Sequence, residues 1–305
     1  MRLILLLALC FFVEGSLYAA YDPFVDGAMA DVRVRVVDDR GEPVEDALVS
    51  IVFMTDAQKV DVAKGLSDRD GYFAAARNCI GEMRLWVRKD GYYDTKIHPT
   101  SFREHSGAEA TKTHRWSERT VVMPIILKKR RHPARIPMHF ADYKRYPATN
   151  EVFKLDLEML EWCPPYGRGK HDDIHLIFEG WRNPKEWLDF YENLKISFPN
   201  GADGFYRVKV DSFSDFKYAY DAELKCTYEK ELEFRHVRKT SGVLESKVLP
   251  KDEYLIFRVR TQTNELGHVT HAHYGRIGEN LSHYIGLSIK AWFNPKEDDV
   301  NLEGL

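Results

Sequence analysis

The sequence has few cysteines, glycines and prolines, and its charges nearly cancel. Four cysteines in 305 residues are too few for a small domain held together by disulfides. The 19 glycines and 13 prolines exclude collagen-like and low-complexity chains. The 44 Lys and Arg residues are balanced by 47 Asp and Glu residues, so the chain lacks the basic excess of a nucleic-acid-binding protein. The 44% hydrophobic and 13% aromatic content is that of a globular protein, and the length predicts about two domains.

Long hydrophobic runs are also missing, apart from one at the start of the chain. After Arg2, residues 3–13 are continuously apolar, and small residues follow up to Ala19 and Ala20. Eleven apolar residues are too few to cross a bilayer, which takes about 20, but they suit the apolar region of a secretory signal peptide. We therefore predict a signal peptide over residues 1–20, cleaved near Ala19 or Ala20. This predicts a secreted or periplasmic protein without a transmembrane segment.

Cleavage would leave three cysteines, Cys79, Cys163 and Cys226. An odd number of thiols in a chain of this size does not form a disulfide framework. We expect these side chains to be small buried hydrophobic groups.

Residues 21–130 have the pattern of a small all-β domain. Val32, Val34 and Val36 alternate with Arg33 and Arg35, which is the period expected of a half-buried strand. Similar patterns predict strands over 47–53, 72–73, 83–88 and 120–127, with a loop over 98–119.

The order of these strands and turns resembles that of the carboxypeptidase regulatory-like domain, a transthyretin-like β-sandwich. The resemblance rests on VRVVDDRGEPV at 34–44, DALVSI at 46–51, SDRDGYF at 67–73 and VRKDGY at 87–92. It implies an accessory scaffold module of an exported, bacterial protein, with no catalytic residues of its own.

A linker and a second domain follow. The basic run 128–131 and the two prolines Pro137 and Pro147 predict a linker over 131–149, and we interpret the basic run as a solvated strand end. Residues 150–305 predict a larger, mostly antiparallel β-rich domain, with strands over 224–236, 254–261 and 284–293.

One amphipathic helix is predicted in this second domain. Asn183 and Pro184 are typical of a helix start, and Trp187, Tyr191 and Leu194 then fall on one helical face. We expect Trp187 to lie in the core.

Two histidine clusters are candidate metal sites. His271 and His273 would share one face of a strand, where two imidazoles can bind one metal ion with Glu279 as a carboxylate ligand. This plan is similar to the His-x-His and downstream Glu of cupins, but the spacing to Glu279 is longer and no second motif supplies the further histidine.

The second cluster, His171, Asp173 and His175, would also share one strand face. Glycines and prolines just before it place it near a loop. Hydrogen-bonding histidines on a sheet surface and a polar turn are the alternatives to metal ligands at the two clusters. The sequence leaves open whether the two clusters meet.

Aromatic residues give a different candidate site. Exposed aromatic rings can stack on sugars or peptides, and Trp162, Tyr166 and Trp181 are the candidates, with Trp162 and Tyr166 expected on the surface beside two prolines.

Three functions remain open. The first is a secreted, non-catalytic protein that binds a carbohydrate or protein ligand, without a cofactor. The second is a metal-dependent enzyme with a divalent transition metal on His271 and His273. The third is a purely structural component of the cell envelope. We found no sequence motif of a Ser, Cys or zinc-protease active site.

Overall fold

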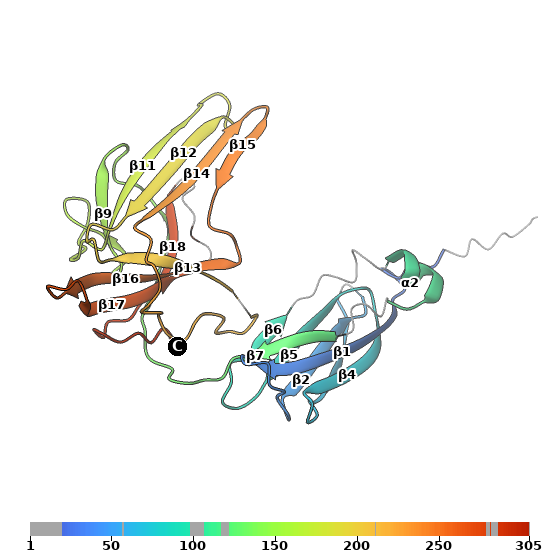
Figure 1. Cartoon of the computed structure of the whole chain (residues 1–305). Helices are drawn as coiled ribbons and strands as arrows, with labels where there is room; N and C mark the ends of the chain where they lie inside the picture. Colours follow the sequence, from blue (N-terminus) through green and yellow to red (C-terminus); the bar gives the residue numbers. More distant parts are fainter. Residues whose placement is uncertain are drawn as a thin grey trace, which may run out of the picture. The chain divides into compact units, whose positions relative to one another are not determined.

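The computed structural model describes residues 20–56, 58–97, 107–116, 122–210, 212–278, 281 and 286–304. The chain divides into two compact units. Unit 1 contains residues up to Arg88 together with 96–125, and unit 2 contains residues 89–95 and 126 onward. Within the described part, strands dominate and α2 (Gly107–Thr113) is the single helix, so the predicted mostly β fold is confirmed (Figure 1). The predicted signal peptide lies outside the described residues, except for Ala20.

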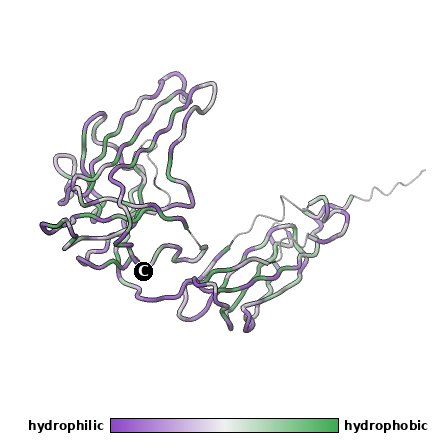
Figure 2. Tube along the Cα trace, in the orientation of Figure 1, coloured by the Kyte–Doolittle hydropathy of each residue, from purple (hydrophilic) through white to green (hydrophobic). Residues whose placement is uncertain are grey.

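Unit 1 is a β-sandwich of two sheets (Figure 1). The predicted alternation is confirmed in its first strand, where Val32, Val34 and Val36 are buried and Arg33 is exposed. Figure 2 shows this alternation of hydrophobic and hydrophilic residues along the strands of both units. One sheet has the order β4 (Tyr72–Cys79), β1 (Ala28–Asp38), β7 (Val122–Leu127), and the other β3 (Val60–Leu66), β2 (Leu48–Met54), β5 (Met83–Arg88), β6 (Thr95–Ile97).

A side-chain hydrogen-bond network holds the turn before β4. The Ser67 hydroxyl donates to the carbonyl of Val44 and accepts the amide of Ala47. Asp68 accepts the amide of Tyr72 at 2.7 Å, and Gly71 has a φ of 82°, which an L-residue adopts only with strain. The turn predicted from Ser67 to Gly71 is therefore confirmed.

Unit 2 contains two larger antiparallel sheets with a core between them (Figure 1). Alternate residues of each strand enter this main core, for example Leu176 and Leu194 from one sheet and Phe257 and Phe293 from the other. The six-stranded sheet has the order β10 (Glu161–Trp162), β9 (Val152–Asp156), β11 (Ile174–Arg182), β12 (Phe190–Ser197), β14 (Glu231–Lys239), β15 (Gly242–Lys247). The five-stranded sheet has the order β13 (Gly204–Lys209), β16 (Glu253–Thr263), β17 (Val269–Ile277), β18 (Leu287–Phe293), β8 (Met138–Lys144).

A second aromatic cluster covers the other face of the five-stranded sheet. The buried Arg276 lies in it, with its guanidinium carbon 4.3 Å from the Tyr218 ring centroid and 4.2 Å from that of Trp292. Lys128 is buried as well and donates to the carbonyl of Tyr218 at 2.6 Å. The interpretation of the basic run as a solvated strand end is therefore wrong for Lys128.

The predicted helix after Asn183 is wrong. The segment is a β-hairpin, in which the Asn183 amide donates to the carbonyl of Asp189 and β12 begins at Phe190. The Asn183 side chain caps the amide of Lys185 at 3.0 Å, so the signal read as a helix cap is a turn. Tyr191 and Leu194 lie on opposite faces of β12 because the side-chain period of a strand is two.

Three other segments also differ from the prediction. The expected linker contains β8, an edge strand that starts just after Pro137, a position that tolerates proline. The expected loop over 98–119 contains α2. The strand expected over 224–236 begins only at Glu231, after a turn that exposes Leu224. Between Leu224 and Glu231, the alternating residues form no strand, and Glu229 makes one isolated antiparallel bridge with Phe205.

Candidate functional site

Trp181 and Tyr191 are direct partners across β11 and β12. Even-numbered residues of these two strands, such as Leu176 and Leu194, enter the main core. Because side chains alternate along a strand, the odd-numbered Trp181 and Tyr191 lie on the outer face of the six-stranded sheet. Trp181 is 50% exposed and Tyr191 is half-buried. We call this pair the aromatic platform.

A row of polar residues borders the platform. Glu179, Asn193, Arg235 and Lys247 are successive cross-strand partners over β11, β12, β14 and β15. The Tyr191 hydroxyl donates to Glu179 at 3.4 Å, and the guanidinium carbon of Arg235 lies 5.6 Å from the Tyr191 ring centroid. Asn193 is buried, and its Oδ1 atom has no hydrogen-bond partner among the described residues. The row therefore combines hydrogen-bonding groups with an aromatic surface.

The other predicted aromatic residues differ in their exposure. The expectation that Trp162 is on the surface is wrong: its side chain is only 5% exposed, and its ring packs edge-on against Phe153 at 5.0 Å. Tyr166 is 40% exposed and donates to Glu151. Trp187 is 67% exposed in the turn of the hairpin that carries the platform, so its expected place in the core is also wrong.

Among the described residues, the ligand atoms of His171, Asp173 and His175 are not brought together as a group. Only His175 lies on a strand, and its Nε2 atom is 2.9 Å from Asp172. His171 is exposed. Asp173 is buried and accepts two hydrogen bonds from Arg260, at 2.9 and 3.0 Å. Asp173 is therefore the partner of a buried cation.

Arg260 is the centre of a buried charge network. Its Nη1 atom also donates to Glu158 at 2.7 Å, and its Nη2 atom lies 3.6 Å from Asp156. Burial alone would lower the pKa of Arg260, but the hydrogen bonds with Asp173 and Glu158 outweigh it and raise that pKa. Arg260 has a φ of 56° at a β-bulge between β16 and β17. Such backbone conformations persist where surrounding contacts enforce them.

The carboxylates of the network differ in their pKa. Burial would raise the pKa of Asp156, but hydrogen bonds from the amides of Met159, Lys170 and His171 lower it below its usual value. Burial raises the pKa of Asp203, which accepts the amides of Arg260 and Thr261 on the same bulge.

His271 and His273 share one face of β17, as their spacing predicts, and this is the face whose other residues enter the main core. His273 is half-buried, and its ring stacks on Phe293 at 5.4 Å. Glu279, the predicted carboxylate ligand, lies outside the described residues. The carboxylates beside His271 come from elsewhere: Asp298 is 2.9 Å and Glu297 is 3.9 Å from its Nδ1 atom.

Phe293 contacts a residue of one predicted cluster and the partner of a residue of the other. Its ring stacks with His273, and the guanidinium carbon of Arg260, the partner of Asp173, is 4.7 Å from the ring centroid. Beside it is a small, mostly apolar cavity of about 310 Å³. This volume is at the lower end for ligand pockets. The cavity is lined by Pro137, His139, Glu158, Met159, Phe293 and Pro295.

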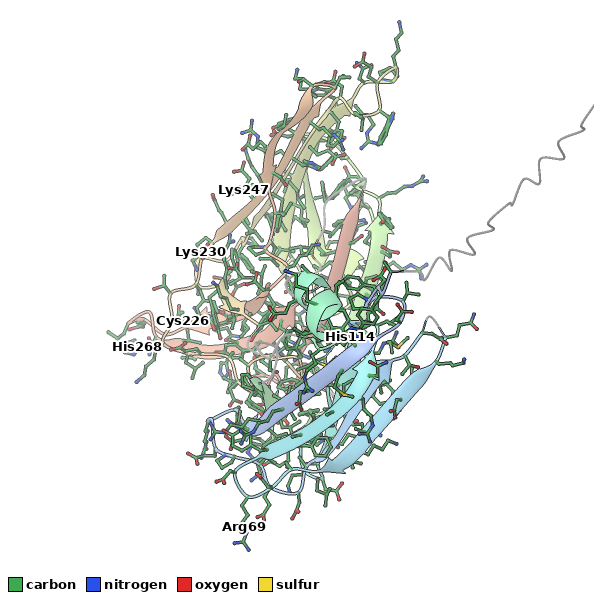
Figure 3. All side chains as sticks on the ribbon, turned by 90° about the vertical axis from the view of Figure 1, so that its right-hand side faces the viewer. Arg69, His114, Cys226, Lys230, Lys247 and His268 are labelled. Carbon is green, nitrogen blue, oxygen red and sulfur yellow. The ribbon has the colours of Figure 1, made fainter. Side chains whose placement is uncertain are left out.

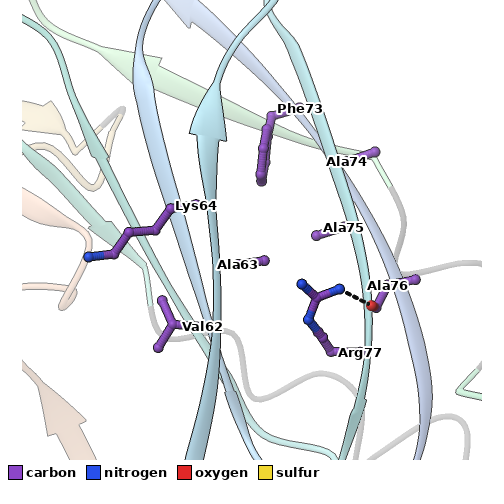
Figure 4. A pocket seen from close by; sticks show the side chains of 8 residues that line it. All are labelled: Val62, Ala63, Lys64, Phe73, Ala74, Ala75, Ala76 and Arg77. Atoms are coloured by element: carbon purple, nitrogen blue, oxygen red, sulfur yellow. Dashed lines mark hydrogen bonds between the residues drawn. The ribbon is translucent and has the colours of Figure 1, made fainter.

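Unit 1 has a wider groove, of about 690 Å³, between the edge strands β3 and β4 (Figure 4). Small side chains form much of it, including Ala63 and Ala75, and an ion pair of 3.1 Å joins Arg77 to Asp61. Its lining contains no Ser, Cys, His, Asp or Glu, and its charged groups are Lys64 and Arg77.

The three described thiols are weak nucleophiles at neutral pH, because burial raises the pKa of each one. Cys79 and Cys163 are buried, and Cys226 is half-buried. Burial and the neighbouring Asp156 raise the pKa of Cys163 to about 11, so its thiol is protonated at neutral pH.

Several site residues were missed at the sequence level. The sequence pattern places Tyr191 on a helix. Arg235 lies next to Asn193 and Tyr191 only because β12 pairs with β14, which the sequence does not reveal. The carboxylates of Glu297 and Asp298 were visible as an acidic stretch near the end of the sequence, but no periodic pattern linked them to His271.

Comparisons with known proteins give weak matches. No protein-family model and no curated protein sequence matches the chain. Among solved structures, 3-chlorocatechol 1,2-dioxygenase from Rhodococcus opacus 1CP is similar over 34% of this chain and 62% of its own, with 14% identity and a TM-score of 0.25. Chlorocatechol 1,2-dioxygenase from Pseudomonas putida is similar over 35% of this chain and 61% of its own, with 14% identity and a TM-score of 0.26.

A third similar structure is the dioxygenase domain of a dioxygenase and carbohydrate-binding protein fusion from Streptomyces sp. SirexAA-E. The match covers 34% of this chain and 81% of that chain, with 12% identity and a TM-score of 0.25. The matched part thus spans about three fifths of the two chlorocatechol dioxygenases. No helix in the described residues is both long and apolar enough to cross a membrane. The three structural matches are too weak to carry a functional assignment.

Proposed function

We propose that this chain is an exported binding protein and that unit 2 binds a carbohydrate on the aromatic platform. The observation that carries the proposal is the direct pairing of Trp181 with Tyr191 on an open sheet face, next to the polar row. The faces of sugar rings carry C–H groups that pack on aromatic rings, while their hydroxyls need donors and acceptors around the edge. Glu179 supplies acceptors and Arg235 supplies donors.

Unit 1 then serves as a scaffold, in line with its resemblance to carboxypeptidase regulatory-like domains. Its turn network at Ser67 and Asp68 maintains the fold and contains no arrangement of catalytic groups. Export through the predicted signal peptide is part of the same proposal, since free polysaccharides and envelope glycans are found outside the cytoplasm.

The experiment is affinity electrophoresis of the mature protein in gels containing a panel of soluble neutral polysaccharides, followed by calorimetric titration with the oligosaccharide of any polysaccharide that retards it. We expect Trp181→Ala and Tyr191→Ala each to weaken binding about tenfold, which corresponds to about 1.4 kcal/mol for one stacked ring. Trp86→Ala is the matched control, because Trp86 is 40% exposed on a sheet face of unit 1.

Two results would contradict the proposal. If no polysaccharide retards the protein, a protein ligand or a purely structural role is favoured. If binding occurs and Trp181→Ala has no more effect than Trp86→Ala, the platform is not the site.

A metal-dependent enzyme is the second candidate. One observation favours it: Pro295, in the wall of the Phe293 cavity, and the two carboxylates beside His271 belong to the same loop, residues 294–299. A metal ion held by that loop would lie near a cavity that could take a small substrate.

A further inference from the structure

His271, Glu297 and Asp298 form a compact group of metal-type ligands in unit 2. One ligand atom of each residue lies within 4.8 Å of the other two. The two distances from His271 Nδ1, 2.9 Å to Asp298 and 3.9 Å to Glu297, bracket the separation of about 3.4 Å that bonds of about 2.0–2.2 Å give between the ligands of a tetrahedral ion.

Asp298 is held in place by the strand that carries His271. Its amide donates to the carbonyl of Ala272, and one of its carboxylate oxygens accepts the amide of Ala272, both at 2.9 Å. The Oδ2 atom faces His271. These contacts fix two of the three ligands relative to each other, which lowers the entropic cost of binding an ion.

The group is also anionic. It places two carboxylates beside one imidazole. The ammonium group of Lys296, in the same loop, pairs with Asp299, with 3.2 Å between Nζ and Oδ2. The positive charge of Lys296 is therefore already balanced by Asp299.

We propose that His271, Glu297 and Asp298 bind one divalent transition-metal ion, such as Zn²⁺. One imidazole and two carboxylates are ligands that suit Zn²⁺, Mn²⁺ and Fe²⁺, and they leave at least one position for water or a substrate oxygen. The ion would clamp the loop 294–299 to β17. This site is independent of the aromatic platform, which lies on the six-stranded sheet.

The test is calorimetric titration of the mature, tag-free and chelator-treated protein with Zn²⁺, with the absorption spectrum of added Co²⁺ as a second reading of the ligand set. We expect one Zn²⁺ per chain, and an affinity at least tenfold lower in His271→Ala and in Asp298→Asn. Asparagine is chosen at 298 because the residue has a φ of 62°, which asparagine tolerates.

His268→Ala is the matched control. His268 is exposed at the β16–β17 turn, three residues before His271, and its side chain is not part of the group (Figure 3). Circular dichroism melting of the metal-free variants separates lost ligands from lost folding. Weak binding that His271→Ala and His268→Ala reduce equally, or no stoichiometric binding, would overturn the proposal without touching carbohydrate binding.

Discussion

Arg260 and Asp173, which are 87 positions apart in the sequence, form a bidentate ion pair inside unit 2. The distance is 2.9 Å from Nε to Oδ1 and 3.0 Å from Nη2 to Oδ2. Asp173 is fully buried, and the Arg260 side chain is only 19% exposed. A buried pair of this kind contributes little net stability compared with apolar residues, but losing one partner leaves the other charge uncompensated.

Asp173→Ala should therefore lower the free energy of unfolding of unit 2 by about 3 kcal/mol. Glu158 and Asp156 still face Arg260 in this variant, which limits the loss. The measurement is urea denaturation of the mature protein at pH 7. The double variant Asp173→Leu/Arg260→Met removes both charges of the pair but leaves Glu158 and Asp156 without their cation, so only part of the stability should return. A loss below about 1 kcal/mol in Asp173→Ala would show that solvent reaches the pair.

The pH dependence of stability should depend on Asp156. Its folded pKa lies below the unfolded value, so its carboxylate stabilises the fold above the unfolded pKa of about 3.9, and this stabilisation is lost as the pH falls through the lower folded value. The stability difference between the wild type and Asp156→Asn should therefore be largest at pH 7 and shrink below pH 4.

Asp203→Asn gives the opposite sign. Because burial raises the pKa of Asp203, ionising this group costs stability, and the wild type gains relative to the variant as the pH falls through the raised folded value. The measurement is the urea denaturation midpoint of the wild type and of both variants between pH 3 and pH 7. Parallel curves for the two variants would contradict the assigned directions.

The sequence predicted unit 1 well because its strands are short-range patterns. Val32, Val34 and Val36 alternate with charged residues, and the Ser67–Gly71 turn contains its own hydrogen-bonding groups. Period-two alternation and turn residues are local properties, so one sequence is enough to recognise them.

The site in unit 2 could not be predicted in the same way. Asp173 was expected to be a metal ligand because nothing local indicates that Arg260 neutralises it. Asn183 and Pro184 favour both a helix start and a turn, and only the pairing of Trp181 with Tyr191 distinguishes the hairpin. Trp162 is buried by pairing with Leu155 of β9, which the adjacent prolines do not reveal.

The free energy of unfolding should therefore be sensitive to substitution of Trp162 and insensitive to substitution of Trp181. Trp162→Phe should lower the free energy of unfolding by about 1–2 kcal/mol, because it shortens a side chain packed in the main core. Trp181→Phe should leave stability within about 0.5 kcal/mol, since half of the side chain is exposed. Urea denaturation measures both variants, and equal losses would contradict the burial of Trp162.

Cys226 should be the thiol that reacts in the folded protein. It is half-buried (labelled in Figure 3), whereas Cys79 and Cys163 are buried. Burial also raises the pKa of Cys226, so its reaction with a disulfide reagent should be slow at pH 7 and faster at pH 9. Titration with such a reagent should detect about one thiol per mature chain before unfolding and three after it. Cys226→Ser should remove the first thiol, and a remaining early reaction would show that a buried cysteine becomes exposed.

Glu303 should have a strong effect on the stability of unit 2. Its carboxylate is buried and accepts three hydrogen bonds, from the Tyr93 hydroxyl at 3.0 Å and from the amides of Arg131 and His132 at 2.9 and 2.6 Å. Glu303→Ala leaves these three donors without their acceptor, so we expect a loss of about 3 kcal/mol in urea denaturation. Glu303→Gln keeps one acceptor oxygen and should lose about half as much. If both variants unfold like the wild type, water must replace the carboxylate, and the contacts of Glu303 would not stabilise this end of the fold.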